Sequence, residues 1–156
     1  MKKVKDFMNK KVIHISPDET IFDAAKRLSK SKIAGAPVIE KNKIVGVISI
    51  SDIVRFIDIK LGRLPKIDTP GISTLVFALI KMEKLRQDFK KEMNKITSFK
   101  VREVMTKNVI TISPSMSLVE VAEMMEKHDV NRLPVVCRGK LVGIVARADV
   151  IKALIN

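Results

Sequence analysis

Two aspartates stand at matching places in the sequence, each where an apolar run gives way to a helical pattern. Asp52 ends the heptapeptide 46–52, and Asp149 ends the heptapeptide 143–149. A carboxylate at the N-terminus of a helix can accept hydrogen bonds from both hydroxyls of a ribose. The backbone N–H groups and the dipole of the same helix favour a phosphate nearby. Each aspartate can therefore be a helix cap only, or can also contact a ligand that approaches the helix start.

The two heptapeptides belong to a longer internal repeat, in which corresponding residues lie 97 positions apart. With no gap, this shift aligns Met8 with Met105, Ile15-Ser16-Pro17 with Ile112-Ser113-Pro114, Pro37-Val38 with Pro134-Val135, and Lys43 with Lys140. The chain therefore contains a tandem repeat, and we expect its function where the two copies meet.

The first copy has the pattern strand, helix, strand, strand, helix. A brief strand is predicted over 12–15, and Thr20 is expected to open the first helix as its N-cap. The break at 34–37 leads to a strand over 38–39, and a polar turn then precedes a second strand over 44–48. Asp52 is expected to cap the closing helix.

The second copy follows the same order. Its predicted strands cover 109–112, 133–136 and 141–145, its first helix opens at Ser117, and Asp149 caps its last helix. The fold class is therefore α/β (α+β), with copies over 1–57 and 99–156 and an insert over 58–98. A copy of about 55 residues buries only ~60% of its unfolded surface, so we expect the copies to pack together about a pseudo-two-fold axis.

The insert is predicted to contain a helix that starts near Thr69 or Ser73 and runs to about Lys95. Its first part, 75–80, is apolar on all sides, and exposed patches of that kind usually mark interfaces. We therefore expect helix 72–96 either to cover the repeats of its own chain or to support a homodimer.

Composition limits the function further. With 46% hydrophobic and 30% charged residues, the chain is expected to be folded and soluble. The single Cys137 cannot form an internal disulfide, and the sequence shows neither a signal peptide nor a stretch able to span a membrane, so we expect a cytoplasmic protein with no membrane partner. His14 and His128 have no matching partners, and no metal-ligand spacing is present, so the sequence predicts neither an enzyme nor a metal site.

The repeated pattern, with x-Pro-Val-h before the hairpin and Gly-h-h-Ser-x-x-Asp after it, resembles the CBS domain. Two copies in tandem resemble a Bateman module. The resemblance covers 1–57 and 99–156, and implies a regulatory unit that senses an adenine nucleotide or S-adenosylmethionine in two clefts between the copies. Such a unit requires no cofactor. It would pass on the binding of its ligand by associating with an effector protein, whose identity the sequence does not give.

The resemblance also implies which residues line each cleft. The first cleft would join Ser49, Ser51 and Asp52 to Val109, Ile110, Val130, Asn131, Arg132 and Leu133. The second would join Arg147 and Asp149 to Ile13, Thr20, Ile33, Ala34, Gly35, Ala36 and Pro37. Ala146 departs from the family pattern, because a serine or threonine is usual there. The cleft that uses Asp52 is therefore expected to bind an adenosyl ligand more tightly, unless Arg147 offsets the lost hydroxyl through a phosphate.

A net charge of +13 leaves a second function open. A basic surface could bind nucleic acid, but most of the excess is explained by solvated lysines spread along the chain. The chain has no Trp, no Tyr and six Phe for stacking on bases. Nucleic-acid binding is therefore the alternative to ligand sensing, and a structural dimeriser is a third interpretation.

Overall fold

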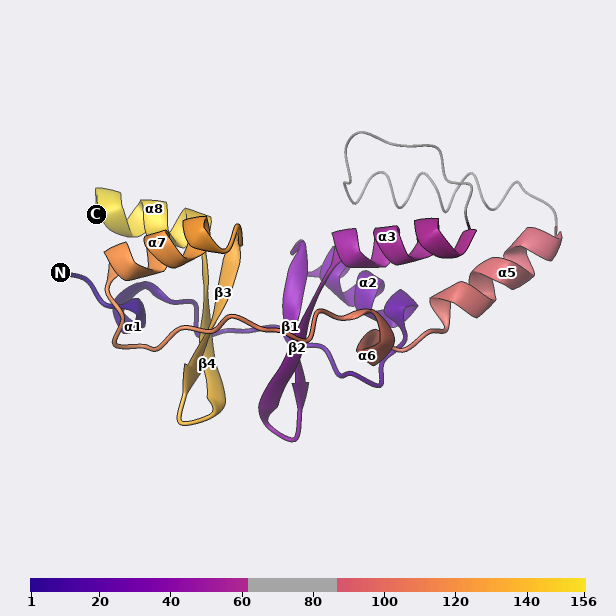
Figure 1. Cartoon of the computed structure of the whole chain (residues 1–156), viewed down its shortest axis with the longest axis horizontal. Coiled ribbons are helices and arrows are strands. Elements are labelled where there is room, and N and C mark those ends of the chain that lie inside the picture. The colour runs from indigo at the N-terminus through magenta and orange to yellow at the C-terminus, as the bar shows by residue number, and fades with distance from the viewer. Residues whose placement is uncertain (62–86) are drawn as a thin grey trace. The chain divides into compact units, whose positions relative to one another are not determined.

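The computed structural model of the chain describes residues 1–61 and 87–156 and combines helices with two antiparallel hairpins. The first part holds α1 (Val4–Phe7), α2 (Ile21–Lys30), β1 (Gly35–Glu40), β2 (Lys43–Ser49) and α3 (Ile50–Leu61) (Figure 1). The second part holds α5 (Gln87–Thr97), α6 (Val101–Val104), α7 (Leu118–Lys127), β3 (Arg132–Cys137), β4 (Lys140–Ala146) and α8 (Arg147–Ile155). The predicted mixture of helices and strands is confirmed.

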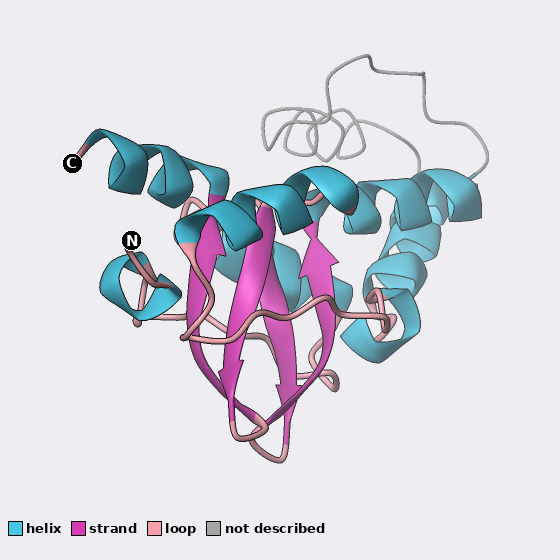
Figure 2. Ribbon diagram, turned by 60° about the vertical axis from the view of Figure 1, so that its left-hand side comes forward, coloured by secondary structure: helices cyan, strands magenta, loops and turns pink. Residues whose placement is uncertain are grey.

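Each hairpin closes through a two-residue turn with a left-handed backbone. Lys41 and Asn42 have φ of 50° and 62°, and Arg138 and Gly139 have φ of 51° and 77°. Positive φ at both central residues defines a type I′ turn, whose twist matches that of the flanking strands. The turns lie at the end of the strands away from the helices (Figure 2). Because the second strand of each hairpin runs away from the turn, the helices that follow these strands, α3 and α8, begin at the opposite end of the hairpin.

The predicted strands over 12–15 and 109–112 are wrong. Ile15 forms one isolated parallel bridge with Val38, and Ile112 forms one with Val135. Pairing ends there because the Ser-Pro dipeptide that follows turns the chain away, and proline restricts the residue before it. These segments are therefore connectors that touch the hairpin at one residue.

The predicted break at 34–37 is also partly wrong, because β1 already begins at Gly35 and contains Pro37. Proline lacks a backbone donor, but only its carbonyl is needed here: Pro37 O accepts the N–H of Ile15 at 3.0 Å. Pro134 O accepts the N–H of Ile112 at 2.9 Å in the same way.

The chain folds into two compact units that exchange their lead-in segments. One unit comprises Met1–His14, Ile39–Ile44 and Asn108–Asn156, and the other comprises Ile15–Val38 and Val45–Lys107. We call them the first and the second unit. Val4 of α1 is fully buried in the core of the first unit, and Val101 of α6 is fully buried in the core of the second. The helix that introduces each copy therefore packs on the hairpin and helices of the other copy.

The exchanged helices are held by matching backbone hydrogen bonds. In the first unit, Val4 donates to the carbonyl of Met116 at 2.9 Å, and Leu118 donates to that of Lys2 at 3.1 Å. In the second unit, Val101 donates to Glu19 at 2.9 Å and Ile21 donates to Phe99 at 2.8 Å. Because each lead-in helix satisfies donors at the start of a longer helix, it stabilises that helix as well as covering its core.

Two glycines of the repeat are explained by the same exchange. Asn9 and Ile144 exchange backbone hydrogen bonds, both of 2.9 Å, and this pairing brings Met8 against Gly143. A Cβ at Gly143 would lie 2.7 Å from the sulfur of Met8, and one at Gly46 would lie 2.6 Å from the sulfur of Met105. The repeated glycine and methionine are therefore a packing pair.

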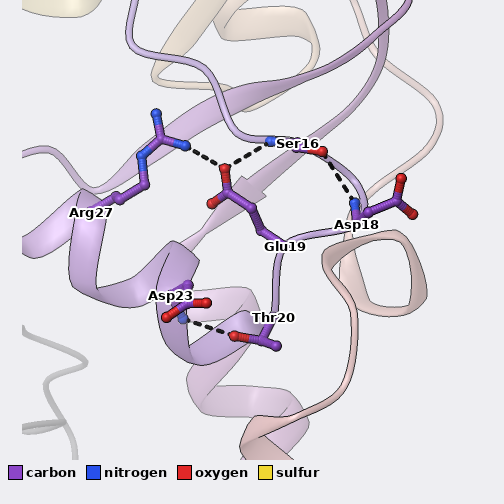
Figure 3. Close-up of polar contacts among 6 residues, drawn as sticks. All are labelled: Ser16, Asp18, Glu19, Thr20, Asp23 and Arg27. Atoms are coloured by element: carbon purple, nitrogen blue, oxygen red, sulfur yellow. Dashed lines mark hydrogen bonds and ion pairs between the residues drawn. The ribbon is translucent and has the colours of Figure 1, made fainter.

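Polar contacts fix the turn before α2, as Figure 3 shows. The hydroxyl of Thr20 accepts the N–H of Asp23 at 3.1 Å, which confirms Thr20 as the N-cap. Glu19 forms an ion pair with Arg27, and its Oε1 also accepts the N–H of Ser16 at 3.3 Å. The turn that follows Ile15 is therefore held by its own side chains.

The last part of the predicted insert helix is confirmed by α5. Met93 and Ile96 are buried in the core of the second unit, as the apolar stripe predicted. The apolar segment 75–80 and the predicted start of the helix lie outside the described residues.

Candidate ligand-binding site

The start of α3 is a capping box in which Ser49, not Asp52, is the N-cap. The N–H of Ser49 donates to Asp52 Oδ2 at 3.0 Å, and the N–H of Asp52 donates to Ser49 Oγ at 3.1 Å. The prediction that Asp52 is the N-cap is therefore wrong by three residues, because Asp52 is the third residue of the helix and its carboxylate accepts the N–H of the cap residue. Its Oδ1 lies 3.8 Å from the guanidinium of Arg55.

The start of α8 has only the carboxylate half of this arrangement. Asp149 Oδ2 accepts the N–H of Ala146 at 2.8 Å, and Ala146 is the N-cap. The prediction of Asp149 as the cap is corrected in the same way. Alanine has no hydroxyl to accept an N–H from the first turn of α8, so this helix start lacks one hydrogen bond that α3 has.

Backbone contacts place each of these helix starts beside the beginning of its own hairpin. In the second unit, the N–H of Ile50 donates to the carbonyl of Ala34 at 2.8 Å. A Cβ added at Gly35 would lie 3.3 Å from Ser49 Cβ, so the backbone of β1 passes directly against the cap residue. We call Ala34, Gly35, Ser49, Ile50 and Asp52 the Asp52 half-site.

The first unit repeats this geometry with different side chains. The N–H of Arg147 donates to the carbonyl of Asn131 at 3.0 Å, and Arg132 pairs across the hairpin with Ala146. We call Asn131, Arg132, Ala146, Arg147 and Asp149 the Asp149 half-site. Within their own unit, Asn131 and Arg132 lie beside Arg147 and Ala146. The assignment of Asn131 and Arg132 to the cleft of Asp52 stays a prediction.

Arg147 has an anionic neighbour that the sequence did not reveal. Its guanidinium lies 3.8 Å from Asp129 Oδ1, and both side chains are at least half exposed. Asp129 has a φ of 48°, a conformation that short polar residues tolerate best. Such an exposed pair is weak, so Arg147 can exchange Asp129 for a phosphate.

The other predicted site residues differ in how accessible they are. Ser51 and Ile13 are exposed, and Thr20, Ile33, Val109, Ile110 and Val130 are half-buried. Leu133, Ala36 and Pro37 are buried, with Leu133 fully enclosed in the core of the first unit. The side chains of these three residues therefore support the hairpins, and only their backbones could face a ligand.

Within the described residues, no group of three histidine, cysteine or carboxylate side chains could hold a metal ion. The described helices also include none long and apolar enough to cross a bilayer.

The sequence-family model named CBS domain matches this chain twice, over residues 4–59 and 101–156. The two matches cover most of the sequence and correspond to the two copies of the repeat. The chain belongs to the CBS domain family.

Relatives of this CBS protein match it along nearly its whole length. An uncharacterized protein of Methanocaldococcus jannaschii, MJ1426, is 38% identical over 154 residues, which are 97% of this chain and 90% of the relative. The crystal structure of CBSX2 in complex with AMP is 26% identical, has a TM-score of 0.68, and is matched over 99% of this chain and 97% of that one.

A second solved structure shares the fold of this CBS protein. It is the CBS domain pair of MJ0100 in complex with 5-methylthioadenosine and S-adenosyl-L-methionine. It is 24% identical, has a TM-score of 0.66, and is matched over 99% of this chain and 96% of that one. The resemblance of the sequence to a CBS pair is therefore confirmed.

Proposed function

We propose that this CBS pair is a regulatory module that binds adenosyl compounds and passes the resulting change to a partner protein. The observation that carries the proposal is the repeated carboxylate of Asp52 and Asp149. Each accepts the N–H of the N-cap residue of a helix, and each helix starts beside the beginning of its hairpin, at the end away from the turn. Candidate ligands are AMP, ADP, ATP and S-adenosylmethionine. The clefts would contain the residues that the family resemblance assigns to them.

Each carboxylate keeps the capacity to bind a ribose. One oxygen accepts a single backbone N–H, at 3.0 Å for Asp52 and 2.8 Å for Asp149. Two carboxylate oxygens offer about four acceptor sites, so both sugar hydroxyls can still be accommodated. The capping hydrogen bond also fixes the carboxylate, which lowers the entropy lost when a ligand binds.

The relative that bears most directly on the ligand is CBSX2, whose structure contains AMP. MJ0100 holds adenosyl compounds in place of a nucleotide. Both ligand types share the adenosyl group, and a carboxylate that recognises the ribose serves either. We therefore include both types in the ligand class of this chain.

We propose that the output is a change in helix position, read by an effector protein. α3 and α8 each begin at the residues assigned to the ligand, so a shift of the half-site moves the whole helix. Exposed apolar residues on α8 offer a surface for association, since Ile151, Leu154 and Ile155 are 56%, 66% and 80% exposed. A homodimer is part of this proposal, and light scattering at micromolar concentration is expected to show two chains per particle.

The competing function is nucleic-acid binding by the basic surface, and the net charge of +13 is the observation that favours it. The two functions differ in their response to salt. Binding to a phosphate backbone weakens by about a thousandfold or more between 50 and 200 mM salt when several phosphates are contacted. Binding of a pocket ligand is expected to weaken only modestly over the same range.

The deciding experiment is a thermal unfolding screen with AMP, ADP, ATP, adenosine and S-adenosylmethionine. A ligand at a hundred times its Kd stabilises the folded protein by about 2.7 kcal/mol. For a chain of this size, that corresponds to a rise in Tm of roughly 5–10 °C. No rise with any adenosyl compound, together with salt-sensitive binding of an oligonucleotide, would overturn the proposal.

A further inference from the structure

The first unit contains a cavity of about 410 Å³ near the turns of its hairpins. It is lined by Lys10, Val12, His14, Ile39, Asn42, Lys140, Leu141 and Val142. All eight residues belong to the first unit, and they include none of the residues assigned to the adenosyl ligand. The volume falls in the range of small-molecule sites.

The chemistry of the lining is divided between cations and apolar side chains. Lys10 and Lys140 are exposed at the cavity, whereas Val12, Ile39 and Leu141 are half-buried. None of the eight lining residues, all of them in the described part of the chain, is acidic. Glu40 follows Ile39 in β1 but does not line the cavity. The cavity lining therefore combines two lysines with an apolar wall and contains no carboxylate.

The backbone around the cavity is well fixed. Asn42 lies in a type I′ turn with a φ of 62°, and Lys140 pairs with Cys137 at the end of the second hairpin. The connector that carries Lys10 and Val12 is anchored at one end by the Asn9 and Ile144 hydrogen bonds. A site built on such anchored positions loses little freedom when it binds.

From this lining we infer a second ligand site, specific for a small organic phosphate whose anionic group lies between Lys10 and Lys140 and whose apolar part contacts Val12, Ile39 and Leu141. The amide of Asn42 can donate a further hydrogen bond to the phosphate. The inference goes beyond the proposed function, because it neither uses nor requires the two aspartates.

The test is a titration of the full-length, nitrogen-15-labelled protein with phenyl phosphate, followed by NMR. Phenyl phosphate is expected to shift the side-chain amide of Asn42 and the backbone signals of 139–142. Lys10→Gln and Lys140→Gln should each weaken binding by roughly threefold to tenfold, the range of one exposed to partly buried ion pair. Lys127→Gln, an exposed lysine of the same unit outside the cavity, should leave the affinity unchanged.

The apolar wall is tested separately. Val12→Thr keeps the shape of the side chain and adds a hydroxyl, so it should weaken phenyl phosphate and leave the binding of inorganic phosphate as it was. Asp52→Ala and Asp149→Ala should not affect phenyl phosphate, which separates this site from the adenosyl clefts. Equal losses with Lys10→Gln and Lys127→Gln, shifts confined to other regions, or equal affinities for phenyl phosphate and inorganic phosphate would each overturn the inference.

Discussion

The Asp52 and Asp149 half-sites share one backbone geometry and differ in the groups it carries. Both have a carboxylate held to the N-cap backbone and a hydrogen bond from the first helical residue to the start of the hairpin. The cap is Ser49 in one and Ala146 in the other. The first helical residue is Ile50, which is buried, in one and Arg147, which is exposed, in the other.

The hairpin residue across from the cap differs as well. Gly35 lies against Ser49, whereas the corresponding Arg132 pairs with Ala146. The Asp52 half-site therefore carries a hydroxyl, and the arginine near its carboxylate is Arg55, one turn further along α3. The Asp149 half-site carries Arg132 and Arg147 and no hydroxyl. The repeat keeps the carboxylate and changes the charged groups around it, so we expect the two half-sites to respond differently to phosphate.

This difference sharpens the ranking of the two clefts. The expectation that the Asp52 cleft binds more tightly assigned it both the hydroxyls and Arg132. Within its own unit, Arg132 pairs with Ala146, so two arginines lie near Asp149 while the serine cap lies beside Asp52. The assignment of Arg132 to the Asp52 cleft stays a prediction. We expect adenosine to prefer the Asp52 half-site, and nucleotides with more phosphates to prefer the Asp149 half-site.

The largest effects should come from removing the carboxylates. Asp52→Ala and Asp149→Ala should each lower the affinity of one of two binding phases by about tenfold to a hundredfold, because a hydrogen bond to a charged group is worth about 1.5–3 kcal/mol. Titration calorimetry with adenosine and with ATP checks which phase is lost. Asp58→Ala, an exposed aspartate on the same helix as Asp52, should leave both phases intact.

The next largest effect concerns the packing of the two repeated glycines against their methionines. Gly46→Ala should lower the free energy of unfolding by about 2 kcal/mol, within the range for overpacking. Its Cβ would meet the Met105 sulfur at 2.6 Å and the Thr106 carbonyl at 2.9 Å. Gly143→Ala should cost less, since its Cβ would lie 3.1 Å from the nearest backbone oxygen. Urea unfolding of both variants measures the order, and a larger loss for Gly143→Ala would contradict it, because both the methionine sulfur and the carbonyl lie closer at Gly46.

Sequence reasoning reached the repeat, the helices and the hairpins because each depends on local pattern. It placed the aspartates at the helix starts but misassigned the caps, since the distinction between the cap and the third helical residue depends on one backbone turn. The exchange of α1 and α6 could not be read from the sequence, because a buried Val4 has the same local pattern whichever core it enters. The Arg147 and Asp129 contact likewise depends on the φ of Asp129, which no local signal indicates.

A moderate effect is expected from the arginines. Arg147→Gln should weaken ATP binding at one phase by roughly threefold to tenfold and leave adenosine unaffected, because an exposed arginine contributes through the phosphates. The residue of the second unit that corresponds to Arg147 is Ile50, which is buried and offers no matching charge to remove. The control is therefore Lys32→Gln, which removes one exposed positive charge from the second unit. A loss of adenosine binding by Arg147→Gln would show that the arginine organises the half-site instead of contacting phosphate.

A smaller effect should follow from exchanging the caps. Ser49→Ala is expected to destabilise the protein by about 1 kcal/mol, and Ala146→Ser to stabilise it by a similar or smaller amount. Ala146→Ser should also raise the affinity of the Asp149 half-site for adenosine by about threefold, the worth of one neutral hydrogen bond. Chemical denaturation and calorimetry measure the two effects, and a stability change of the same sign in both variants would contradict the capping argument.

The smallest effect concerns the pH dependence of stability. It compares Glu120 at the start of α7 in the first unit with Asp23 at the start of α2 in the second. The backbone N–H of Ser117 donates to Glu120 at 2.6 Å, and this bond, followed by the Ser117 hydroxyl and the charge of Lys3, holds the pKa of Glu120 below its ordinary value. A carboxyl with a lowered folded-state pKa adds stability above its unfolded pKa, about 4.3, and loses it as the pH falls through the folded value.

Glu120→Gln should therefore remove a small part of the acid sensitivity of unfolding, because glutamine keeps the capping geometry without titrating. The variant and the parent should differ more above about pH 4.3 than well below it, where the carboxyl of the parent is protonated in both states. Asp23→Asn is the matched control at the corresponding position of α2, where Thr20 accepts the N–H of Asp23. Urea unfolding between pH 3 and 7 gives the comparison; a difference between Glu120→Gln and the parent that does not change with pH would mean that the charge of Glu120 does not stabilise this helix start.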